Sequence, residues 1–61
     1  MSFTNADKLA CAERELRLRK NVYRNRVLVG RMTQAFANRE IALMTDIRDD
    51  YAVQVQREQL L

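Results

Sequence analysis

The residues best suited to chemistry in this 61-residue sequence are three aspartates, Asp46, Asp49 and Asp50. Carboxylate oxygens bind divalent cations, and the first two aspartates share one side of a helix because they are three residues apart. A cation site needs further oxygen ligands from a loop, and the surrounding sequence has a helical pattern without one. We therefore expect a solvated acidic face and no metal.

The chain has few of the residue types that commonly catalyse reactions or bind metals. Histidine is absent and Cys11 is the only cysteine, so neither a zinc cluster nor an intrachain disulfide can form. Cys11 stands between two alanines, which favours a small buried hydrophobic residue over an intersubunit disulfide or a reactive thiol. We expect no catalytic residue and no cofactor, so the chain is not an enzyme.

The most regular set of charged residues is basic. Arg17, Arg24 and Arg31 are seven residues apart, and with Arg14 and Lys20 they form one basic face of a helix. Such a face can bind phosphates, but nucleic-acid binders commonly add aromatic stacking platforms. The aromatic residues lie elsewhere: Phe3, Tyr23, Phe36 and Tyr51. The pattern favours a solvated face, and it leaves an acidic protein partner and nucleic acid open.

These side chains are carried by two expected helices. The chain has one glycine, Gly30, and no proline, so the long helix-forming stretches are interrupted once. We expect an all-α fold of one domain, a two-helix antiparallel hairpin with helices at about 5–29 and 34–60 and a turn at about 30–33. Gly30 is the hinge.

Each end of the first helix has a recognisable signal. Thr4 followed by Asp7 approximates a capping box, with a carboxylate near the positive end of the helix dipole. Gly30 can adopt the left-handed conformation that ends a helix, and Thr33 then caps the second helix.

The apolar residues form more surface than a hairpin can cover. The second helix has one stripe of Ala37, Ile41, Met44, Ile47, Tyr51 and Val55. The first has a main stripe of Leu9, Ala12, Leu16, Tyr23 and Val27, and a rotated second group of Cys11, Leu18, Val22 and Val29. One partner helix cannot cover both groups, so we expect a homodimer in the form of a four-helix bundle, with a third or kinked helix segment as the alternative. The candidate dimer or partner interface is Cys11, Leu18, Val22, Val29 and Tyr51.

Charge is divided between the two helices. Residues 5–31 hold eight cations against three carboxylates, a balance of +5, whereas residues 33–61 hold three against five, a balance of −2. Opposite charge favours antiparallel docking, although exposed pairs contribute only about 0–1 kcal/mol each.

The length of the chain and its first residues bear on how it is stabilised and where in the cell it is found. A chain of about 60 residues buries only about 60% of its unfolded surface, and without disulfides or metal the remaining source of stability is association. The first five residues lack the basic-then-apolar pattern of a signal peptide, and no run approaches the roughly 18 apolar residues of a membrane span. We expect a cytoplasmic protein that does not enter a membrane.

The sequence at residues 7–16, 30–35, 39–44 and 49–51 resembles a family of small early proteins of lambdoid phages and prophages. These proteins are of the kind encoded between the exonuclease and excisionase genes. The resemblance covers most of the chain and implies early expression in the host cytoplasm and an influence on the host cell cycle or on phage development. It supplies no catalytic or ligand residues.

The chain departs from that family at two places. Members often carry Tyr-Pro where this sequence has Tyr23-Arg24, and Lys-Ala-Asp where it has Phe36-Ala37-Asn38. Without the proline, the first helix can run unbroken through Tyr23.

Together these features predict a protein-interaction module, a homodimer that binds a host or phage protein without catalysis. Inhibition of an enzyme or a toxin role is a special case of that function. The alternative is a nucleic-acid-binding hairpin dimer that uses the basic face.

Overall fold

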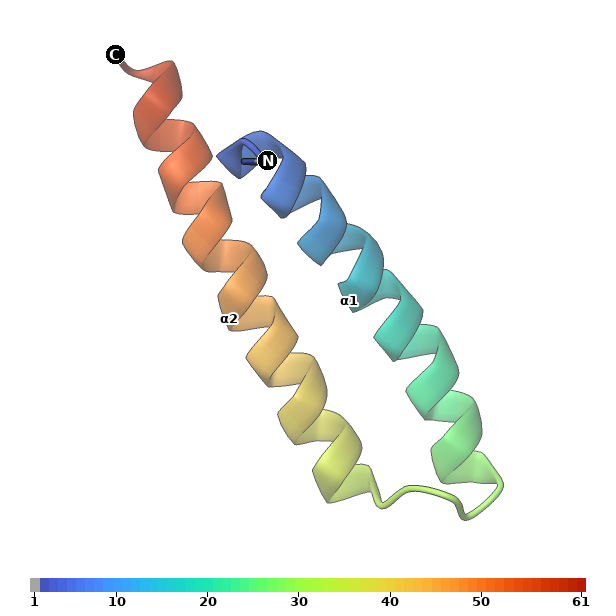
Figure 1. Ribbon diagram of the computed structural model, residues 1–61. Helices are drawn as coiled ribbons and strands as arrows, with labels where there is room; N and C mark the ends of the chain where they lie inside the picture. Colours follow the sequence, from blue (N-terminus) through green and yellow to red (C-terminus); the bar gives the residue numbers. More distant parts are fainter. Residues whose placement is uncertain (1) are drawn as a thin grey trace.

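The computed structural model describes residues 2–61 and consists of two α-helices, α1 at Asn5–Leu28 and α2 at Gln34–Gln59. The helices run antiparallel and lie side by side, so the chain starts and ends at the same end of the hairpin (Figure 1). The expected all-α hairpin is confirmed, and each helix ends one residue earlier than expected. Met1 lies outside the described residues.

The caps of α1 follow from residues at its two ends. The Thr4 hydroxyl accepts a hydrogen bond from the Asp7 N–H at 3.0 Å, and the Asp7 carboxylate accepts one from the Thr4 N–H at 3.3 Å. This is a complete capping box. At the other end, Gly30 has φ 77°, in the left-handed region. The Arg31 N–H then donates to the Arg26 carbonyl at 2.8 Å, so the last turn is closed as in a Schellman motif.

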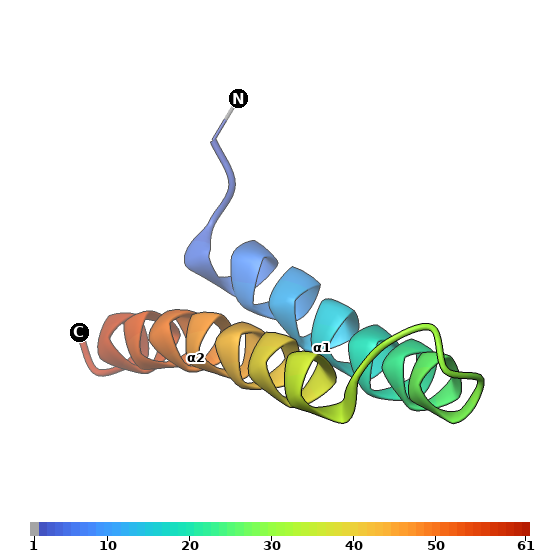
Figure 2. The same ribbon diagram turned by 90° about the horizontal axis from the view of Figure 1, so that it is seen from below.

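A short turn separates the helices and leads into the second cap. The Thr33 hydroxyl accepts a hydrogen bond from the Phe36 N–H at 3.1 Å, as the sequence predicts. Figure 2 shows the segment before α1 rising away from the helix pair, and Phe3 in that segment is exposed.

The hydrophobic core is small. The buried hydrophobic residues among residues 2–61 are Ala12 and Leu16 of α1 and Ala37 and Met44 of α2. Ile41 packs against the cluster that Ala12, Leu16 and Met44 form. All five belong to the two predicted stripes. A core of this size leaves much of the apolar content of the chain on the surface.

Ile47 and Cys11 were expected to be buried against other apolar groups, but both are exposed. Ile47 is 39% exposed, and Arg48 lies at the edge of the helix contact with 34% of its side chain exposed. The reason is helical spacing: position 48 is four residues after Met44 and faces the helix contact, whereas position 47 is rotated by about 100° from position 48. Cys11, expected to be buried, is exposed because it is rotated by the same angle from Ala12.

Candidate functional site

One side of the hairpin carries an uncovered apolar surface from both helices. We call it the apolar face, and its residues are Cys11, Leu18 and Val22 of α1 and Phe36, Leu43 and Ile47 of α2. Within each helix the three residues follow one another at intervals of seven and four. That spacing puts each set on one side of its helix. Leu18 is 56% exposed and Leu43 is 43% exposed.

A shallow hollow shows that the two sets lie on the same side of the molecule. It has a volume of about 300 Å³ and lies where the helices meet. Cys11 and Ala12 line it from α1, while Met44, Ile47 and Tyr51 line it from α2. Lys8 and Glu15 of α1 also line the hollow, so Cys11 and Ile47 lie on the same side of the helix contact with charged groups beside them.

A polar group interrupts the apolar face at its centre. The Arg19 Nε donates to the Glu15 carboxylate at 3.0 Å, and its Nη1 donates to the backbone carbonyl of Glu40 on α2, also at 3.0 Å. Only 24% of the Arg19 side chain is exposed. Arg19 therefore links the two helices, a role that was not predicted from the sequence. Its place seven residues after Ala12, on the main stripe, is the signal that could have revealed it.

The predicted interface residues are only partly brought together. Cys11, Leu18 and Val22 share the apolar face, but Val29 forms the C-terminal cap of α1 and is exposed at the turn. Tyr51 is half-buried within the hairpin, with the Lys8 ammonium 5.7 Å from its ring centroid. Its ring therefore belongs to the rim of the helix contact rather than to the centre of the apolar face. The α2 half of the face was missed; Phe36, Leu43 and Ile47 have the same spacing as the α1 half, which is the signal that could have found it.

The basic face is divided: Lys20 and Arg24 lie on the other side of the helix contact from the apolar face, whereas Arg14 lies beside Cys11 and precedes Leu18 by four residues. Lys20 follows the buried Leu16 by four residues and Leu18 follows it by two, so these two side chains point about 160° apart. All members of the basic face are exposed: Arg14, Arg17, Lys20, Arg24 and Arg31. Among residues 2–61 the ion pairs are Arg19 with Glu15 and Arg48 with Asp49, so no carboxylate pairs with the basic face.

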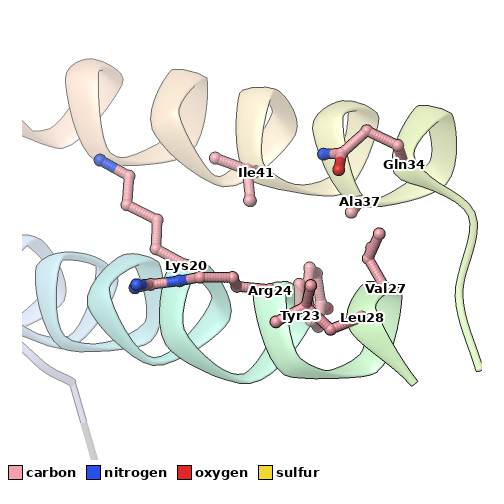
Figure 3. A pocket seen from close by; sticks show the side chains of 8 residues that line it. All are labelled: Lys20, Tyr23, Arg24, Val27, Leu28, Gln34, Ala37 and Ile41. Carbon is pink, nitrogen blue, oxygen red and sulfur yellow. The ribbon is translucent and has the colours of Figure 1, made fainter. Parts of the chain in front are cut away.

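A groove opens on this basic side, near the turn, with a volume of about 220 Å³. Figure 3 shows Val27 of α1 and Ile41 of α2 pointing into the space between the helices, and Lys20 extending towards α2. Ala37 completes the floor, and Lys20 and Arg24 stand at its edge. The groove thus combines an apolar floor with a cationic edge.

The acidic cluster lies on α2, where Asp50 borders the apolar face because it follows Leu43 by seven residues. Asp46, Asp49 and Asp50 are exposed, and Asp49 accepts a hydrogen bond from the Arg48 Nε at 2.7 Å. In the described part of the chain, no three His, Cys, Asp or Glu side chains are grouped so that they could hold a metal ion.

The length and apolar content needed to cross a membrane are not combined in either helix of residues 2–61. Comparisons of the chain with protein-family models, with curated proteins and with solved structures find no match. The two faces of the hairpin are therefore the observations that bear on function.

Proposed function

We propose that this protein is a non-catalytic interaction module that dimerises through the apolar face and, as a homodimer, binds a host or phage protein in the host cytoplasm. The observation that carries the proposal is the matched pair of uncovered apolar sets on α1 and α2. Leu18 and Leu43 are the middle residues of the two sets, and each is about half exposed in the single hairpin.

Burial of the face supplies stability that one hairpin lacks. Complete burial of a Leu, Ile or Phe side chain contributes about 1.5–3 kcal/mol relative to full exposure, so a half-exposed side chain stands to gain about half of that. The hairpin itself buries only four hydrophobic residues in the part of the chain that the structure describes. A second hairpin laid on the face would add its own six side chains to the core, as four-helix bundles do.

The spacing of the face suits a second copy of the same chain. In a two-fold dimer of antiparallel hairpins, α1 of one copy can lie against α2 of the other, because such an interface is self-complementary. Both helices then contribute apolar residues at intervals of seven and four, which keep each set on one side of its helix. Glu15 and Glu40 occupy equivalent places in the two sets, four residues after Cys11 and four after Phe36.

Those two glutamates favour one alignment of the copies. Glu15 is already hydrogen-bonded to Arg19, and the same arginine is bonded to the backbone of Glu40. A polar group within an apolar helix contact lowers stability in alignments that leave it unpaired, so it selects register. The dimer is therefore expected to have a defined geometry rather than a sliding one.

A role in phage development or host physiology is consistent with the resemblance to small early phage proteins. Dimerisation through the apolar face leaves Lys20 and Arg24 of each copy on the outside, since they lie on the other side of the helix contact. Protein partners of the dimer can reach that side.

Sedimentation equilibrium at micromolar concentration tests the dimer. We expect a mass of two chains for the unaltered protein and one chain for the double change Leu18→Glu with Val22→Glu, because two charges would enter the interface. Val53→Glu is the matched control: Val53 is exposed and lies about 120° around α2 from Ile47. A stable monomer, or a double variant of unchanged mass and stability, contradicts the proposal.

A further inference from the structure

The groove on the basic side takes no part in the proposed dimer contact through the apolar face. Val27, Ala37 and Ile41 form its floor, and the ammonium of Lys20 and the guanidinium of Arg24 stand at its edge (Figure 3). Its volume of about 220 Å³ is below the roughly 300–1,000 Å³ of pockets for drug-sized molecules. The space therefore suits a single large side chain better than a free small molecule.

The two cations at the edge lack an internal counter-charge. The Arg24 Nη2 donates to the Asn21 side-chain oxygen at 3.0 Å, which is a neutral acceptor. Lys20 makes no ion pair within residues 2–61. The carboxylates of α1 lie nearer its N-terminus: Asp7, Glu13 and Glu15. Glu40, the nearest acidic residue along α2, belongs to the side that carries the apolar face. The potential at the groove is therefore positive.

We propose that this groove binds an acidic segment of a partner protein. One apolar side chain of the segment packs on Val27 and Ile41, and neighbouring carboxylates of the segment pair with Lys20 and Arg24. Apolar anchors in small pockets with charges around them are the usual source of affinity and of partner choice in such contacts.

The composition of the groove favours a protein over a nucleic acid. Bases stack on accessible aromatic rings, but Tyr23, the aromatic residue at the groove, is half-buried, and the Arg26 guanidinium lies 6.0 Å from its ring centroid. A phosphate backbone needs only cations, so it would use Arg14 and Arg17 as much as Lys20 and Arg24. An acidic peptide with an apolar anchor is the ligand that uses the floor as well as the edge.

The inference rests on the proposed protein-binding function but does not require the dimer, because one hairpin supplies every residue that lines the groove. The probes are three short synthetic peptides of Glu residues with a central Leu, Phe or Trp, and a matched peptide with a central Ser. Each is titrated into ¹⁵N-labelled protein, and backbone amide shifts are followed by NMR.

We expect at least one peptide with an apolar centre to shift the amides of Tyr23, Arg24 and Ile41, with the Ser peptide binding several-fold more weakly. Lys20→Glu combined with Arg24→Glu should weaken binding about tenfold or more, because two attractive pairs become repulsive. Arg39→Glu is the matched control, since Arg39 is exposed on α2 and does not line the groove. Circular dichroism of each variant confirms that it remains helical.

Three results would overturn the proposal. One is the absence of shifts with all three peptides at millimolar concentration, and another is equal binding of the Ser peptide. The third is a duplex DNA or RNA oligonucleotide that binds when the peptides do not. Its binding would then be lost as fully on Arg14→Glu with Arg17→Glu as on Lys20→Glu with Arg24→Glu. Sedimentation of the same samples separates the two proposals, because a monomer that binds the peptide contradicts only the dimer, and a dimer that binds none contradicts only the groove.

Discussion

The Arg19 guanidinium on α1 donates a hydrogen bond of 3.0 Å to the backbone carbonyl oxygen of Glu40 on α2. The same side chain holds the Glu15 carboxylate at 3.0 Å, so one arginine connects both helices and one acidic group of the apolar face. The acceptor on α2 is a main-chain atom, and the link therefore does not depend on the side chain at position 40.

Replacement of Arg19 tests that link. Arg19→Met keeps the apolar stem and removes the guanidinium, and we expect it to lower the free energy of unfolding by about 1.5–3 kcal/mol, the range for hydrogen bonds to charged groups. Urea denaturation measures the change. Arg14→Met, at an exposed position without a hydrogen-bond partner in the described residues, should change stability by less than about 0.5 kcal/mol. Glu40→Gln should retain the link. Equal effects of the two arginine changes would argue against it.

The left-handed conformation of Gly30 makes the turn sensitive to substitution. A Cβ at this position would meet no atom within 4 Å, so the penalty comes from the backbone alone. At φ 77° we expect Gly30→Val to cost about 1–2 kcal/mol, and Gly30→Asn less, because asparagine tolerates this region. Thermal unfolding at one fixed concentration compares the two. We expect dimerisation to weaken along with the turn in the Val variant; a Val variant as stable as the Asn variant contradicts the assigned backbone.

The capping box of α1 predicts a separate effect at the other end of the hairpin. Thr4→Ala removes the acceptor for the Asp7 N–H, and we expect a loss of about 1 kcal/mol in the free energy of unfolding. Ser2→Ala, two residues earlier and outside the helix, is the control. Both are measured by urea denaturation. A loss of helix stability confined to Ser2→Ala would be inconsistent with Thr4 as the cap.

The α2 half of the apolar face should matter as much as the α1 half. Leu43→Glu places a charge in the dimer interface, so we expect monomers at micromolar concentration. A melting temperature that rises with protein concentration in the unaltered chain, and no longer does so in this variant, is the second readout. If Leu43→Glu left both the mass and this concentration dependence unchanged, α2 would not contribute to the interface.

The candidate site was predicted unevenly from sequence. The α1 members of the apolar face, Cys11, Leu18 and Val22, were found because they stand out from the main stripe. The α2 members were missed because Ile47 was assigned to the helix contact, and Phe36 and Leu43 were left out of the predicted stripe. A spacing of three and four residues does not fix which residues at the edge of a stripe face the partner helix. That choice depends on how the partner helix packs. The groove was not predicted, since it needs residues from both helices.

What the sequence determined by itself is local. The two helices, the capping box at Thr4, the left-handed Gly30 and the cap at Thr33 all follow from interactions within a few residues, which any single sequence displays. The tertiary structure alone decided how each helix is rotated about its own axis. That rotation follows from packing between residues far apart in the chain, and it places Arg19 between the helices, leaves Ile47 exposed and forms the groove beside Lys20.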